Sequence, residues 1–78
     1  MGAREEILNV CVRLAASSSD GTFTLSQVLD EMRRQGTSYS EATIRTHVTS
    51  RMCADAPDNH GTTYTDLRRV DRGLYRLG

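Results

Sequence analysis

Two adjacent segments decide the fold: "TFTLSQVLDEMRRQG", residues 22–36, and "TSYSEATIRTHVTSRM", residues 37–52. In the first segment, Thr24 and Gln27 have the spacing of a capping box, in which each side chain accepts a hydrogen bond from the backbone N–H of the other residue. A helix is therefore expected to begin at Leu25. The apolar residues that follow recur at helical spacing, which predicts that one face of this helix is buried.

The second segment predicts another helix a short distance further along the chain. Gly36 suits the left-handed backbone conformation that ends many helices. Ser38 and Glu41 again have the spacing of a capping box, so the next helix is expected to begin near Tyr39 or Ser40. The connection would then be only about four residues long, as in a helix-turn-helix.

Outside these segments the sequence predicts one more helix and a β-hairpin. Apolar residues recur at helical spacing over residues 3–16, before a run of turn formers. Residues 22–24 suit a short extended segment, and residues 54–63 are expected to form a loop because they contain proline, asparagine and glycine. The end of the chain, "YTDLRRVDRGLYRLG", reads as two strands around a turn at residues 71–73. Its imperfect alternation leaves the strand register open.

The composition is typical of one small globular domain spanning residues 1–78. Hydrophobic residues make up 37% of the chain and there is a single proline, which argues against disorder. No apolar run approaches the roughly 20 residues that cross a bilayer, so no membrane partner is expected. The first residues lack the basic and apolar regions of a signal peptide. We therefore expect a cytoplasmic protein.

The charge is balanced overall but unevenly distributed. Ten acidic residues offset ten basic ones, which argues against the strongly basic surface of many small nucleic-acid binders. All ten basic residues are arginines, and an arginine can make two hydrogen bonds to a phosphate or a guanine. A codon bias toward arginine would explain the same composition. Residues 43–51 hold two arginines and a histidine without an acid, and residues 68–78 hold four arginines against one aspartate.

The helix expected at residues 39–52 has an unusual outer face. At about 100° per residue, Ile44, Val48 and Met52 fall on one stripe, which we assign to the core. The side chains nearly opposite that stripe carry short hydroxyl groups: Thr43, Thr46 and Ser50. His47 and Thr49 lie at the two sides of the stripe. Threonine costs up to about 0.7 kcal/mol relative to alanine in a helix, so a requirement other than helix stability is indicated.

This face has the chemistry that reads DNA in the major groove. Threonine offers a hydroxyl to base edges and a methyl group to thymine. Arg45 is placed to read guanine or to bind phosphate, and Ser40 lies at the helix N-terminus, which suits a phosphate. Each feature also has a structural explanation: Arg45 sits four residues after Glu41, a favourable ion pair, and the threonine face could contact another protein domain.

Two further groups of residues are candidates for DNA contact. Arg68, Arg69 and Arg72 could bind the backbone or the minor groove, or could simply be solvated and paired with nearby aspartates. The loop residues Asn59 and His60 could reach a groove or cap the core.

Catalysis and metal binding are not expected. Cys53, His47 and His60 lack the paired spacing of a zinc site, and no phosphate-binding glycine loop or pair of catalytic carboxylates is present. Two cysteines in a cytosolic chain are more consistent with reduced thiols than with a disulfide, and Cys11 falls on a buried helix face. We expect neither an enzyme nor a bound cofactor.

The segments "FTLSQVLDEM", "YSEATIRTHV" and "RVDRGLYRL" resemble, in order and spacing, the second helix, recognition helix and wing of winged helix-turn-helix domains. The chain is further similar to winged-helix modules attached to restriction-type endonucleases and DNA-modification proteins. The resemblance implies an α+β fold, a three-helix winged helix-turn-helix with a C-terminal β-hairpin wing, and a fused or associated nuclease domain. It also implies that the partner is double-stranded DNA, with 5-methylcytosine as a candidate target.

The sequence therefore leads to one main functional hypothesis and one alternative. The main hypothesis is sequence- or modification-dependent binding of double-stranded DNA, with the third helix in the major groove and the wing on the backbone. The alternative is a winged-helix module that binds another protein. The residues expected to contact DNA are Ser40, Thr43, Arg45, Thr46, His47, Thr49, Ser50, Asn59, His60, Arg68, Arg69 and Arg72.

Overall fold

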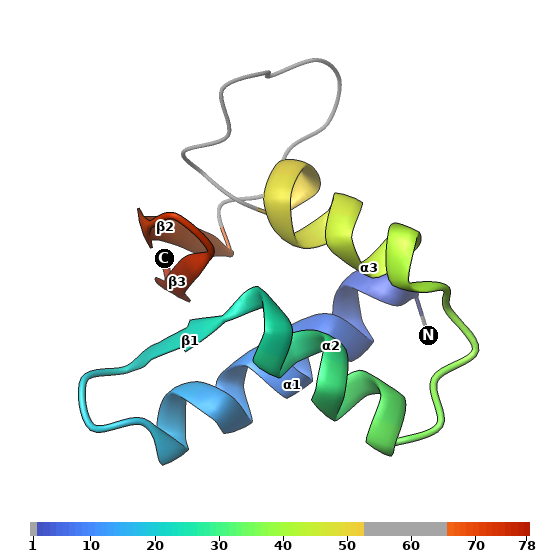
Figure 1. Cartoon of the computed structure of the whole chain (residues 1–78), viewed down its shortest axis with the longest axis horizontal. Helices are drawn as coiled ribbons and strands as arrows, with labels where there is room; N and C mark the ends of the chain where they lie inside the picture. Colours follow the sequence, from blue (N-terminus) through green and yellow to red (C-terminus); the bar gives the residue numbers. More distant parts are fainter. Residues whose placement is uncertain (1, 53–65) are drawn as a thin grey trace.

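The computed structural model describes residues 2–52 and 66–78, with the backbone alone at Ser50 and Arg51 (Figure 1). Within these residues the fold is α+β, with three α-helices, one π-helical turn and a three-stranded antiparallel sheet. The elements are α1 (Ala3–Ser17), β1 (Thr22–Thr24), α2 (Leu25–Arg34), α3 (Glu41–Thr46), η1 (His47–Arg51), β2 (Leu67–Asp71) and β3 (Leu74–Leu77).

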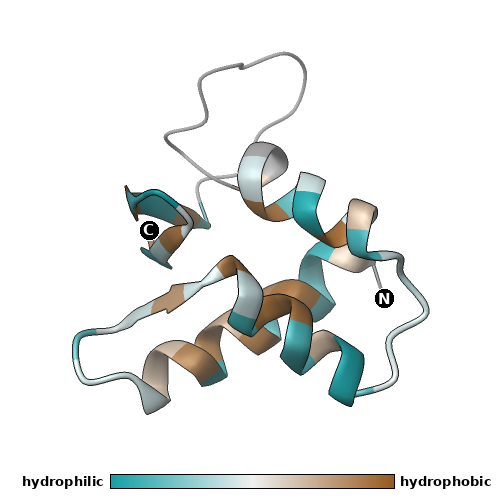
Figure 2. Ribbon diagram, in the orientation of Figure 1, coloured by the Kyte–Doolittle hydropathy of each residue, from teal (hydrophilic) through white to brown (hydrophobic). Residues whose placement is uncertain are grey.

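The helix α1 packs against α2, β1, β3 and η1, so it forms the centre of the core. It ends one residue later than the sequence predicts. In Figure 2 the brown, hydrophobic segments of α1 and α2 lie where the two helices meet. The buried core side chains are Ile7, Val10, Cys11, Phe23, Val28, Met32, Ile44, Val48, Met52, Leu67 and Tyr75.

The helix α2 begins and ends as its sequence predicts. The Thr24 N–H donates to Gln27 Oε1 at 2.8 Å, and the Gln27 N–H donates to Thr24 Oγ1 at 3.1 Å, which completes the capping box. At the other end Gly36 has a φ of 75°, and the Thr37 N–H donates to the Met32 carbonyl at 3.2 Å. This bond spans six residues and is one of the two hydrogen bonds of a Schellman motif. The motif satisfies carbonyl groups at the end of the helix.

The start of α3 differs from the prediction. The N-cap is Ser40, whose Oγ accepts from the Thr43 N–H at 3.2 Å, so the predicted capping box of Ser38 and Glu41 is wrong. The connection from α2 covers residues 35–40 rather than about four residues. A tertiary contact explains the difference, because Thr37 Oγ1 donates to Glu6 Oε2 of α1 at 2.6 Å and accepts from the Tyr39 N–H at 3.2 Å. These bonds hold the chain in a turn past Ser38.

A second difference lies at the end of α3, where the expected continuous helix changes to the π-helical turn η1. The Met52 N–H donates to the His47 carbonyl at 2.7 Å, which is the i to i+5 pattern of a π-helix. Thr49 Oγ1 donates to the Arg45 carbonyl at 2.8 Å, and such side-chain bonds compete with the regular helix. The predicted core stripe is nevertheless confirmed: Ile44, Val48 and Met52 are all buried.

The strand order is β1-β3-β2, with β3 in the middle of the sheet. The hairpin and its turn lie where the sequence predicts, and Gly73 in the turn has a φ of 67°. Arg69 pairs with Tyr75 and Asp71 pairs with Leu74, so Val70 is an extra residue that forms a bulge. This bulge is the physical reason for the imperfect alternation in the sequence.

One half-buried ion pair joins α1 to the start of the hairpin. Arg4 Nε and Nη2 donate to the two carboxylate oxygens of Asp66 at 2.8 and 2.9 Å. Two parallel bonds of this kind are stronger than a single neutral hydrogen bond and fix the orientation of both groups. The pair therefore positions the hairpin relative to the helices.

Among the described residues, none of the helices combines the length and the apolar character needed to cross a bilayer.

Candidate nucleic-acid interface

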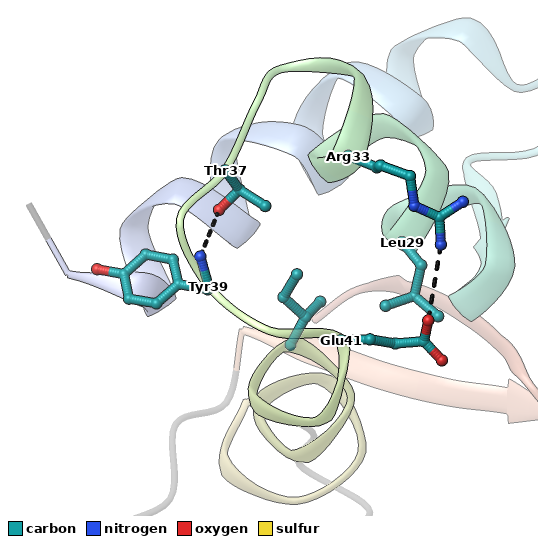
Figure 3. A pocket seen from close by; sticks show the side chains of 6 residues that line it. Leu29, Arg33, Thr37, Tyr39 and Glu41 are labelled. Atoms are coloured by element: carbon teal, nitrogen blue, oxygen red, sulfur yellow. Dashed lines mark hydrogen bonds and ion pairs between the residues drawn. The ribbon is translucent and has the colours of Figure 1, made fainter.

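The inner side of α3 is held by α2 and by the turn that joins the two helices. Ile44 packs inward, and a hollow of about 140 Å³ remains between the two helices (Figure 3). Arg33 Nη2 lies 3.6 Å from Glu41 Oε1, so an ion pair ties α2 to the first residue of α3 at one side of this hollow. The core contact and the ion pair fix which face of α3 points outward.

The outward face of α3 is lined by short side chains. An open, shallow hollow of about 300 Å³ lies on this surface. Its lining consists of Ala42, Thr43, Thr46 and His47, which come from successive turns of one helix face. The predicted outward position of Thr43 and Thr46 is therefore confirmed. No long side chain stands over this hollow among its lining residues.

The hydroxyl groups on this face differ in how far they are already occupied. Thr46 is exposed, and its hydroxyl makes no hydrogen bond with any described residue. Ser40 Oγ and Thr43 Oγ1 share a hydrogen bond at 3.0 Å, and Thr49 Oγ1 donates to the Arg45 carbonyl. Thr46 is thus the hydroxyl best placed to contact another molecule.

His47 lies beside these threonines and is half-buried. Its Nδ1 is 2.8 Å from the Thr43 carbonyl oxygen, an atom that can only accept a hydrogen bond. Nδ1 must therefore carry a proton. This bond holds the imidazole ring against its own helix.

Arg45 forms the ion pair with Glu41 that the four-residue spacing in the sequence predicts. Its Nη2 lies 3.0 Å from Glu41 Oε2, and both side chains are 54% exposed. An exposed ion pair of this kind contributes only about 0–1 kcal/mol. Arg45 could therefore leave Glu41 and bind an external phosphate with little loss of free energy.

The hairpin carries the second group of candidate residues. Arg68 and Arg69 are exposed on β2 and Arg72 is exposed in the turn. The nearby aspartates have other bonds, since Asp66 pairs with Arg4 and Asp71 Oδ1 accepts from the backbone N–H of Arg72 at 2.7 Å. Arg69 Nε donates to the Asp71 carbonyl at 3.4 Å.

The strand register adds an arginine that the predicted site omits. Arg76 on β3 is exposed and pairs directly with Arg68 on β2, with Thr22 of β1 on its other side. Like charges directly across two strands repel, so an anion near both would relieve this repulsion. A two-residue turn without a bulge would instead pair Arg76 with Arg69, and this is why the sequence alone does not identify the pair.

The structure brings the predicted residues together in two groups. Ser40, Thr43, Arg45, Thr46, His47 and Thr49 share the segment from the N-cap of α3 into η1, whereas Arg68, Arg69 and Arg72 belong to the hairpin. In Figure 1 both α3 and the hairpin lie above α1, α2 and β1. The backbone of Ser50 belongs to η1, but its side chain lies outside the description, as do Asn59 and His60.

Ala42 is a further residue of this surface that the predicted site omits. Its methyl group lines the hollow on α3 beside Thr43 and Thr46. Its position four residues before Thr46 places both residues on the same face of the helix, and only its lack of a polar group hides it in the sequence.

The described residues offer little for metal or thiol chemistry. No group of three or more histidine, cysteine, aspartate or glutamate side chains among them could hold a metal ion. Cys11 is buried in the core, and its burial, with a smaller contribution from the Asp66 carboxylate, raises the pKa of the thiol to about 12. The Cys11 thiol is therefore held in its protonated, unreactive form.

Comparisons with known proteins give one match. Neither a curated protein nor a solved structure matches the chain. A family model described as "Domain of unknown function (DUF7669)" matches residues 6–77, which is nearly the whole chain. The chain therefore belongs to the DUF7669 family of domains.

Proposed function

We propose that this chain is a winged helix-turn-helix domain that binds double-stranded DNA. In this proposal α2 and α3 form the helix-turn-helix, α3 enters the major groove and the β2–β3 hairpin is the wing. The domain acts by binding alone, and any cleavage or modification of DNA belongs to a fused or associated nuclease domain.

The observation that carries the proposal is the outward face of α3. The major groove is about 12 Å wide, and close approach of a helix backbone to the base edges requires short side chains on the outer face of that helix. Ala42, Thr43 and Thr46 meet this requirement, and the exposed Thr46 hydroxyl has no partner among the described residues. A helix face selected only for solubility would favour glutamate, lysine and arginine instead.

The charge distribution supports the same orientation. Arg45 lies at the edge of this face, held only by an exposed ion pair, and could turn to a phosphate or a guanine. The hairpin presents Arg68, Arg69, Arg72 and Arg76 in the part of the molecule where α3 also lies. Arginines beside a reading helix fix the register of a protein on DNA through the phosphates.

The methyl groups around the hollow make a methylated base a candidate target. The side chains of Ala42, Thr43 and Thr46 each end in or carry a methyl group, and such groups contact the C5 methyl of thymine in the major groove. A 5-methylcytosine presents its methyl group at the same place. The proposal therefore includes both modified and unmodified DNA.

The test is a fluorescence polarisation titration of the purified domain against unmodified and cytosine-methylated duplexes over a range of salt. With about four or five phosphate contacts, log Kd should change with log salt with a slope of magnitude about 4. A slope near zero, or no binding at low salt, would overturn the proposal. An absence of DNA binding would favour the protein-binding alternative.

Charge reversal of Arg45 separates a DNA contact from a general charge effect. Arg45→Glu should abolish binding at moderate salt, because it replaces a phosphate or base contact by a repelled carboxylate. The matched control is Arg13→Glu on α1, since Arg13 is also exposed and also pairs with a glutamate, Glu31, at 3.8 Å. Equal losses in both variants would mean that only net charge matters.

A further inference from the structure

The imidazole of His47 is fixed in a way that determines what its other nitrogen can do. Nδ1 donates to the Thr43 carbonyl at 2.8 Å, so Nδ1 holds the proton of the neutral ring. Nε2 of that neutral ring is then a hydrogen-bond acceptor with no proton to donate. No described residue bonds to Nε2, and His47 lines the hollow on the outer face of α3.

In the neutral ring, this tautomer prevents Nε2 from bonding to a phosphate. A phosphate oxygen only accepts hydrogen bonds, so it cannot bond to an acceptor nitrogen. The neighbouring side chains on the hollow are Ala42, Thr43 and Thr46, and none of them carries a charge that would attract a phosphate there. The partner of Nε2 in the neutral ring must instead be a donor.

The bases differ in whether they present a donor in the major groove. Cytosine offers its N4 amino group and adenine offers its N6 amino group, whereas guanine and thymine offer acceptors only. We propose that His47 Nε2 accepts a hydrogen bond from the exocyclic amino group of a cytosine or an adenine, and so acts as a specificity-determining residue of this domain. The proposal rests on the function proposed above, because it requires α3 to lie in the major groove.

The geometry around His47 should strongly disfavour a guanine or a thymine at the position that contacts Nε2. The hydrogen bond to the Thr43 carbonyl ties the ring to its own helix and limits its freedom to turn away. A guanine or thymine at this position would place an acceptor against an acceptor. Two acceptors left unpaired in a closed interface cost more than a missing hydrogen bond alone.

The first experiment selects binding sites from a pool of duplexes with a randomised central region, using the wild type and His47→Ala. The wild type should enrich cytosine or adenine at one position, and His47→Ala should lose that preference while it keeps the others. Enrichment of guanine or thymine at the position affected by His47→Ala would overturn the proposal. So would an unchanged set of preferences.

The second experiment removes the amino group from the DNA and leaves the protein intact. In the selected site, the cytosine is replaced by pyrimidin-2-one, which lacks the amino group, or the adenine by 2-aminopurine, which carries it in the minor groove. Wild-type affinity should fall about 5- to 10-fold, the value of one hydrogen bond. The same replacement should leave the affinity of His47→Ala unchanged, and an equal loss in both proteins would refute the contact.

Two controls keep the outcome interpretable. His47→Phe keeps a ring but has no acceptor, so it should behave as His47→Ala does, and it replaces that variant if the alanine protein does not fold. If the wild type binds no duplex at low salt, the proposed function itself fails. If the wild type binds DNA but shows no preference that depends on His47, only the present inference fails.

Discussion

α2 and α3 are neighbours in the sequence and pack against each other, yet they are stabilised in different ways. α2 has a reciprocal capping box at Thr24, a Schellman motif at Gly36 and arginines in its last turn. α3 has a single cap at Ser40, extends over Glu41–Thr46 only and then changes to a π-helical turn. The comparison indicates that α2 is a structural helix, whereas the outer residues of α3 are suited to contact another molecule.

The threonines illustrate the difference. In α2 the threonine is the N-cap, a position where its hydroxyl stabilises the helix. In α3 and η1 the threonines at positions 43, 46 and 49 lie inside the helical segment, where they lower its stability. Three sets of variants test whether this contrast reflects function.

The largest effect is expected from a charge on the outer face of α3. Thr46→Glu should lower DNA affinity about 100-fold, because it removes a base contact worth about 1–3 kcal/mol and adds repulsion from phosphate. The melting temperature should change little, since Thr46 is exposed. Ser26→Glu is the matched control, because it makes the same kind of change on an exposed residue of α2 and should leave affinity intact. Similar losses in the two variants would break the comparison.

An intermediate effect is expected from the two caps. Thr24→Ala removes one half of a reciprocal pair and should cost about 1–2 kcal/mol of unfolding free energy. Ser40→Ala removes the bond from the Thr43 N–H and an exposed bond to Thr43 Oγ1 at the start of a short helix, and should cost about 0.5–1 kcal/mol. Urea denaturation of both proteins measures the difference. A larger loss of unfolding free energy in Ser40→Ala than in Thr24→Ala would contradict this contrast between α2 and α3.

The smallest effect is expected from removal of the Thr46 side chain. Thr46→Ala should raise the unfolding free energy by roughly 0.5 kcal/mol, because alanine is the better helix former and no hydrogen bond to a described residue is lost. DNA affinity should fall about 5-fold as the hydroxyl contact disappears. A variant that is more stable and binds DNA as well as the wild type would remove the functional explanation for this threonine.

The contrast between the two helices also explains what the sequence can predict. The bounds of α2 follow from local signals at Thr24, Gln27 and Gly36, which act on neighbouring residues. The predicted cap of α3 at Ser38 was wrong, because the chain between the helices is held by Thr37, which bonds to Glu6 of α1, and the cap is Ser40. A contact between distant residues cannot be read from local spacing.

The π-helical turn and the hairpin register were hidden for a related reason. Ile44, Val48 and Met52 have a spacing that suits an α-helix, and they remain buried although the backbone changes at His47. In the hairpin, the turn was predicted from residues 71–73, but the bulge at Val70 was not. The predicted face of α3 survived because it depends on burial of the opposite stripe and not on the details of the backbone.

The bulge at Val70 has a consequence for the behaviour of the protein in solution. Among the described strands, β2 lies at an edge of the sheet, and an edge strand can pair with the strand of another molecule and so start aggregation. The bulge interrupts the row of backbone donors and acceptors on this edge, and Arg68 and Arg69 add charge beside it. The hairpin can therefore project an exposed valine without offering a regular template for intermolecular sheet growth.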